Sequence, residues 1–202
     1  MGKFLILSIV TFVLLIIATI FSYSKYAKNK IRFGFYGVSA LFYLLFVVFA
    51  LLWTKESFVD YPEQVKFVYG IVIGFSLILL GILVTPLFVK VYKIKLGLYF
   101  VEAFILVSWL ILTVFACLWA GKTYEAHSPA VAISSAICLC FFILTCILPF
   151  YIKSYGNLAT YINIGLMFVF GLAFILLAVK QSRVMLNNEI GTSVQFIQYL
   201  MK

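Results

Sequence analysis

The chain contains very little charge. Only 10% of its 202 residues are Asp, Glu, Lys or Arg, whereas 66% are hydrophobic, and the mean hydropathy is +1.20. A typical soluble domain is about half apolar and about a quarter charged. The composition therefore excludes a water-soluble globular fold and predicts a multi-pass membrane protein.

The sequence also lacks the residue sets that most enzymes and metalloproteins use. It has one histidine, His127, and none of its four cysteines forms a C-x-x-C pair. The chain has no Ser-His-Asp set, H-E-x-x-H or Walker motif, and one histidine excludes bis-histidine haem ligation within it. We therefore expect no catalytic activity, no cofactor and no metal site. The cysteines are expected to pack as buried, small apolar groups: Cys117, Cys138, Cys140 and Cys146.

Apolar runs long enough to cross a membrane occur six times. A helical span needs about 20 residues, and the runs between charged segments are 4–22, 34–53, 66–89, 97–120, 129–151 and 158–179. The first run could be mistaken for a signal peptide, but its counterparts later in the chain favour a span. We predict an all-α integral membrane protein with six transmembrane helices within residues 1–180.

Residues 181–202 form a polar, amphipathic tail after the last apolar run. Gly191, Thr192 and Ser193 are expected either to cap a short final helix or to belong to a frayed terminus. The apolar residues Val194, Ile197, Leu200 and Met201 would share one face of such a helix. That face would lie on the membrane or dock on a partner.

Lys and Arg gather in alternate loops of the predicted bundle. The first, third and fifth loops carry Lys and Arg but no acids, whereas the second and fourth loops mix both signs. The positive-inside rule places the basic loops in the cytoplasm or matrix and both termini outside. The membrane would be the bacterial cytoplasmic membrane or an organellar inner membrane.

The basic loops predict contact with anionic lipid head groups on the inner side. The alternative is that these bases serve only to set the topology. Because they sit at the ends of spans and form no RNA-binding motif, the net charge of +9 does not indicate nucleic acid. The cluster comprises Lys28, Lys30, Arg32, Lys90, Lys93, Lys95 and Lys153.

An internal repeat runs through the chain. Residues 30–40 align with 93–103 at an offset of 63, with identical Lys, Ile, Gly, Tyr, Val and Ala, and residues 86–92 align with 149–155 at the same offset. The pattern predicts three tandem two-helix hairpins, approximately 1–63, 64–126 and 127–180, in parallel orientation. The alternative is chance similarity between apolar helices that share the same boundary residues.

Glu102 is the one acid inside a predicted span. An ionisable group within a membrane marks a functional site by default, and the repeat places Ser39 at the equivalent position of the first hairpin. With Ser39 and Ser108, Glu102 forms a candidate intramembrane polar site for a cation, a proton or a partner's base. The competing interpretation is a carboxylate that extends to the basic interface and pairs with Lys95.

These features favour a non-catalytic, multi-pass subunit of a larger membrane protein complex, which would contact other membrane subunits. The alternative is a small-solute or ion transporter or channel that uses the intramembrane carboxylate of Glu102. The lack of a polar lining through the spans favours the first hypothesis.

The predicted orientation can be tested by labelling from each side of the membrane. In a variant without the native cysteines, single cysteines near Lys28 and Lys93 should react only from inside, and those near Asp60 and Glu125 only from outside. The physical reason is that Lys and Arg are retained on the inner side during insertion. Swapped accessibility would refute the orientation.

Overall fold

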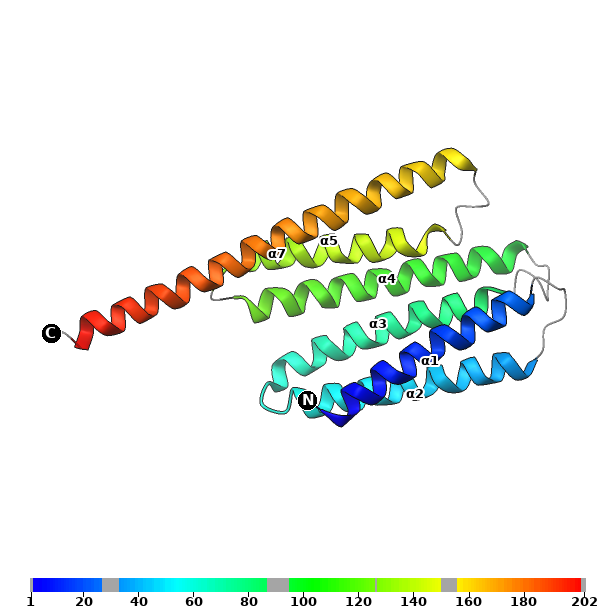
Figure 1. The fold of residues 1–202 in the computed structure, drawn as a ribbon, viewed down its shortest axis with the longest axis horizontal. Coiled ribbons are helices and arrows are strands. Elements are labelled where there is room, and N and C mark those ends of the chain that lie inside the picture. Colours follow the sequence, from blue (N-terminus) through cyan, green and yellow to red (C-terminus); the bar gives the residue numbers. More distant parts are fainter. Residues whose placement is uncertain (1, 27–32, 87–94, 126, 150–155, 201–202) are drawn as a thin grey trace. The chain divides into compact units, whose positions relative to one another are not determined.

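The computed structural model describes residues 2–26, 33–86, 95–125, 127–149 and 156–200. Its described secondary structure is helical, and six helices are long and apolar enough to cross a membrane (Figure 1). The structure therefore confirms the all-α fold and the six spans. The helices are α1 Lys3–Tyr26, α2 Phe33–Ser57, α3 Pro62–Pro86, α4 Lys95–Thr123, α5 Pro129–Ile147 and α7 Asn157–Leu200.

The ends of the helices follow from local sequence. Pro62 and Pro129 are the first residues of α3 and α5, where the N–H that proline lacks would have no intrahelical partner anyway. Gly156 precedes α7 with a φ of +102°, a conformation that glycine adopts without steric cost. Five helices agree with the predicted spans to within about four residues at each end.

The sixth helix differs from its prediction. It does not stop near residue 179 but continues without a break to Leu200, so that one helix of 44 residues includes most of the predicted polar tail. Gly191 lies inside this helix and does not begin a new one. Polar residues such as Lys180 and Gln181 end an apolar run, but both are good helix formers.

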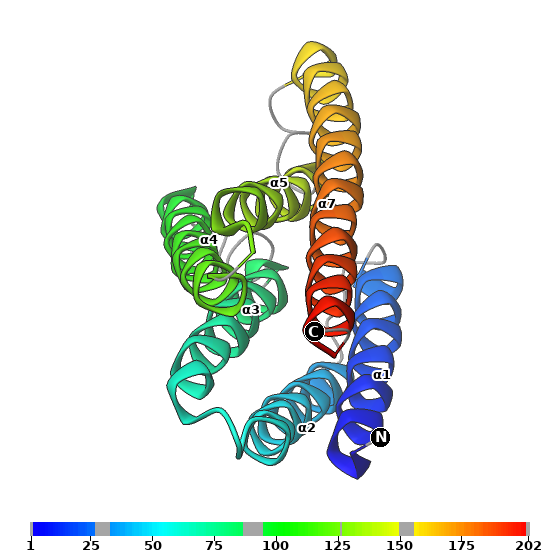
Figure 2. The ribbon, with the colours of Figure 1, turned by 90° about the vertical axis from the view of Figure 1, so that its left-hand side faces the viewer.

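The chain divides into two compact units, Met1–Leu112 and Thr113–Lys202, and each is described by itself. In the first unit α2 packs against both α1 and α3, and it lies between them when viewed end-on (Figure 2). Phe12, Phe46 and Phe75, one from each helix, form a ring cluster with centroids 5.3–6.3 Å apart. Such aromatic contacts add to the packing of the three helices.

Two glycines bring α3 close to α4 within the first unit. A Cβ atom at Gly74 would lie 2.8 Å from the backbone nitrogen of Leu112, and one at Gly81 would collide with the side chain of Ile105. Small residues at such contacts let helices approach closely in lipid, where the hydrophobic effect does not drive them together. Gly74 and Gly81 therefore permit the close approach of this helix pair.

In the second unit α5 and α7 form an antiparallel pair. Phe141 stacks on Phe170 with ring centroids 4.9 Å apart, and Phe142 lies against Gly171. Asn163 of α7 donates from Nδ2 to the carbonyl oxygen of Thr145 at 2.8 Å. From the Asn163–Thr145 contact to the Phe170–Phe141 contact, the residue number rises along α7 and falls along α5. The two helices are therefore antiparallel.

The glycine contact predicts a selective loss of stability. Gly74→Ala should lower the free energy of unfolding by about 1–3 kcal/mol, because the added methyl group meets the Leu112 backbone, which cannot move aside like a side chain. The matched control is Gly37→Ala, where a Cβ would meet no atom within 4 Å. It should be neutral or slightly stabilising. Thermal unfolding in detergent measures both, and equal stability of the two variants would contradict the close contact.

Candidate functional site

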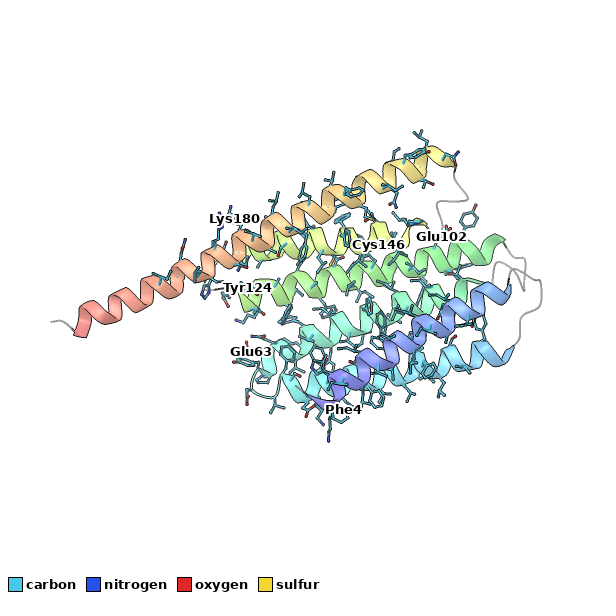
Figure 3. All side chains as sticks on the ribbon, viewed as in Figure 1. Phe4, Glu63, Glu102, Tyr124, Cys146 and Lys180 are labelled. Atoms are coloured by element: carbon cyan, nitrogen blue, oxygen red, sulfur yellow. The ribbon has the colours of Figure 1, made fainter. Side chains whose placement is uncertain are left out.

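Glu102 lies near the start of α4 (Figure 3), within the candidate span Tyr99–Thr123. Its side chain is partly exposed, and the neighbouring Tyr99 and Phe100 are 62% and 68% exposed. In the described part of the chain, no hydrogen-bond or ion-pair partner lies within reach of its carboxylate. Glu102 is thus an intramembrane acid without a partner among the described residues of its own chain.

The two candidate serines lie elsewhere in the first unit. Ser39 is fully buried, and its Oγ lies 3.4 Å from the Oγ of Ser22 on α1. Ser108 is also buried and donates to the carbonyl oxygen of Phe104 at 2.7 Å. The described contacts of the two serines are to groups other than Glu102, and the grouping of the three residues in one polar site stays a prediction.

Most buried hydroxyl groups bond to their own helices. Thr11 donates to Leu7, Thr54 to Ala50 and Ser76 to Val72, each four residues back, at 2.7–2.9 Å. Such back-bonding satisfies a hydroxyl in lipid without a partner from another helix. Tyrosines supply two cross-helix bonds, from Tyr36 Oη to the Leu83 carbonyl oxygen and from Tyr43 Oη to the Ser76 carbonyl oxygen.

The predicted basic cluster is almost entirely outside the described residues. Lys28, Lys30, Arg32, Lys90, Lys93 and Lys153 lie outside them, and Lys95 is described only as the first residue of α4. A pairing between Lys95 and Glu102 is therefore also outside the description. The cluster stays a prediction.

The fourth loop and the cysteines are described in more detail. Lys122 and Glu125 form an exposed ion pair of 3.0 Å, and His127 is exposed. Among the described residues, no three His, Cys, Asp or Glu side chains gather as a metal site would require. The four cysteines form no disulfide bond, and only Cys140 is buried while Cys146 is exposed, so the expectation that all four are buried is wrong.

The sequence interpretation missed two buried amides in the second unit. Asn163 is only 3% exposed, and while its Nδ2 bonds to Thr145, its Oδ1 has no partner within the described chain. Gln181 is 7% exposed, and neither of its amide atoms has a partner there. The two residues are 18 apart, which is about five helical turns, so both lie on one face of α7. For Asn163 the available signal was an amide within a long apolar run, whereas Gln181 lies in the polar segment that follows the run.

Comparison with protein-family models, with curated proteins and with solved structures finds no significant match for this chain.

Two nearly isosteric substitutions test the amide between α5 and α7. Asn163→Asp should lower the free energy of unfolding by about 1–3 kcal/mol, because the carboxylate loses the donor to Thr145 and places oxygen against oxygen. Asn163→Leu should cost less, because it removes the unpaired Oδ1 together with the donor. Unfolding in detergent measures the difference, and a larger loss for Leu than for Asp would contradict this geometry.

Proposed function

We propose that this chain is a non-catalytic, multi-pass subunit of a larger membrane protein complex. The observation that carries the proposal is the carboxylate of Glu102, which lies in a span without a partner among the described residues of its own chain. A charged side chain costs about 2.5–3.5 kcal/mol at the centre of a membrane helix and less near its end. A lysine, an arginine or a hydrogen-bond donor from another subunit would remove this cost.

The position of Glu102 supports an external partner. Its neighbours Tyr99, Phe100 and Leu106 are each more than half exposed, while Val101 and Ile105 are buried in the first unit. Glu102 is thus next to the exposed face of α4, where a helix from another chain can reach it. The other partners that we propose are anionic lipid head groups at the inner basic cluster.

The behaviour of the hydroxyl groups supports a structural role over transport. A conducting path needs polar groups that point into a hydrated space, whereas Thr11, Thr54, Ser76 and Ser108 donate to carbonyl groups of their own helices. The protons of these four hydroxyls are therefore used within their own helices and are not available to donate to a passing solute. A transporter that uses Glu102 would need other polar groups to complete its path.

We further propose that the six spans arose as three tandem hairpins. In the first hairpin, contacts join Phe12 with Phe46 and Ser22 with Ser39. Shifting the Gly81–Ile105 contact of the second hairpin by the offset of 63 gives residues 18 and 42. Shifting the Phe141–Phe170 contact of the third by twice that offset gives residues 15 and 44. Both shifted pairs fall between the two observed contacts of the first hairpin, as a common register requires.

Substitutions at Glu102 test the proposed function. Glu102→Leu should lower the amount of co-purifying partner by at least about tenfold, which corresponds to about 1.4 kcal/mol, because the partner's polar group loses its acceptor. Glu102→Gln should keep most of the complex, because an amide retains much of the hydrogen bonding. The measurement is the molar ratio of co-purifying polypeptides after extraction from native membranes in mild detergent.

The matched control is Glu125→Leu, which removes an exposed acid that pairs with Lys122 and should leave the ratio unchanged. If Glu102→Leu behaves like this control, the carboxylate does not hold a partner. If Glu102→Gln abolishes a pH-dependent flux through the reconstituted chain while the fold persists, the protein is a transporter.

A further inference from the structure

The first turn of α5 leaves two backbone N–H groups without an acceptor. Ser128 precedes the helix but makes no side-chain hydrogen bond to it, and Pro129 has no N–H. Ala132 donates to the carbonyl oxygen of Ser128 at 3.2 Å, which leaves the N–H groups of Ala130 and Val131 without a partner in the described part of the chain. The turn also lacks an acidic residue that would complement the helix dipole. Such a helix N-terminus favours an anion.

Gln181 of α7 faces this same turn. It follows Phe170 by as many residues as Ala130 precedes Phe141, the ring on which Phe170 stacks, so the antiparallel register places Gln181 opposite Ala130. Its side chain is 7% exposed, and neither Nε2 nor Oε1 has a hydrogen-bond partner among the described residues. Buried amides are nearly always hydrogen-bonded, and an unpaired one calls for an explanation such as a bound ligand. This amide is independent of the helix terminus, and both point to the same place.

The first turn of α5 lies at one end of the membrane spans. The candidate span of α4 ends at Thr123, and that of α5 begins at Pro129. The short loop between them is therefore at the membrane surface, where the polar head groups of the lipids lie. A ligand can reach this turn from the lipid and from water.

The charges beside the turn also favour an anion. Lys180, which precedes Gln181, is exposed (labelled in Figure 3). Glu125, the acid of the loop before α5, is paired with Lys122 at 3.0 Å. Because these two charges cancel, Lys180 leaves one net positive charge near the turn.

From these groups we infer an anion-binding site at the start of α5, which goes beyond the proposed function and does not depend on it. Its ligand is a phosphate group. The N–H groups of Ala130 and Val131 and the Nε2 of Gln181 donate to the phosphate oxygens, and the ammonium group of Lys180 lies at the side. The flexible side chain of Gln181 lets its amide turn from its buried position toward the ligand.

A phosphate group at this depth belongs either to a phospholipid head group or to a water-soluble phosphate compound. The chemistry of recognition is the same for both, because the donors contact only the phosphate oxygens. The two sources differ in how they reach the site, so the test uses one probe for each.

Thermal unfolding of the full chain, in a phosphate-free detergent and with any partner that co-purifies, tests the site. The probes are inorganic phosphate and phosphatidylglycerol, each compared with chloride at the same ionic strength. At least one probe should raise the melting temperature of the wild type, because a ligand that binds the folded state stabilises it. A rise with inorganic phosphate indicates a soluble ligand, and a rise with phosphatidylglycerol alone indicates a lipid.

Gln181→Leu should change two measurements in opposite directions. Without a probe it should melt at a higher temperature than the wild type, because it replaces an unpaired buried amide by an apolar group of similar size. Its affinity for the probe should fall by at least about tenfold, because a charge-assisted hydrogen bond is lost. The matched control is Gln64→Leu on α3, which should keep the affinity of the wild type.

Lys180→Met should lower the affinity by about threefold, as expected of an exposed charge, while Lys55→Met at the end of α2 should not. Three results would overturn the inference. Neither probe stabilises the wild type; the probe stabilises Gln181→Leu as much as the wild type, which indicates an adventitious ion only; or Gln181→Leu is less stable than the wild type without a probe, which indicates that the amide is paired within the chain.

Discussion

Hydrocarbon offers no hydrogen bonds, so each helix in a membrane must satisfy its own backbone, and most of its polar side chains as well. This constraint accounts for the way Thr11, Thr54 and Ser108 donate to carbonyl groups one turn back. It also means that apolar surface does not drive the helices together, since lipid is as apolar as leucine. The described units are held instead by close contact at Gly74 and Gly81, by stacked rings, and by a few bonds such as that from Asn163 to Thr145.

The same constraint explains why a carboxylate within a span indicates a function more strongly than a hydroxyl does. A hydroxyl can be satisfied by its own helix, but a carboxylate cannot, because it has no proton to donate when it is charged. Glu102 is therefore different in kind from Ser39 and Ser108, with which the sequence grouped it. Both serines are buried, whereas Glu102 is partly exposed and has no described partner. An acid next to the exposed face of α4, without a partner among the described residues, is consistent with a partner outside the chain.

The spans could be predicted from the sequence, because charged residues cannot enter the bilayer cheaply and so bound each apolar run. The true end of α7 could not, since the polar residues after Val179 end a span without ending a helix. The glycine spacing in α3 indicated a helix contact, but only the structure identifies Leu112 and Ile105 as the residues that it meets. The contact of Asn163 could not be predicted, because it depends on the carbonyl group of Thr145 on another helix, and sequence does not reveal that neighbour.

The central claim is that this chain works as one component of an assembly. The most direct measurement is the composition of the particle that the wild-type chain forms when it is extracted from native membranes in nanodiscs, without crosslinking. The account predicts the 22.9 kDa chain together with at least one other membrane polypeptide, in a molar ratio that stays constant through successive purification steps. A homogeneous particle that contains only this chain, and that carries solute or proton flux after reconstitution, would contradict it.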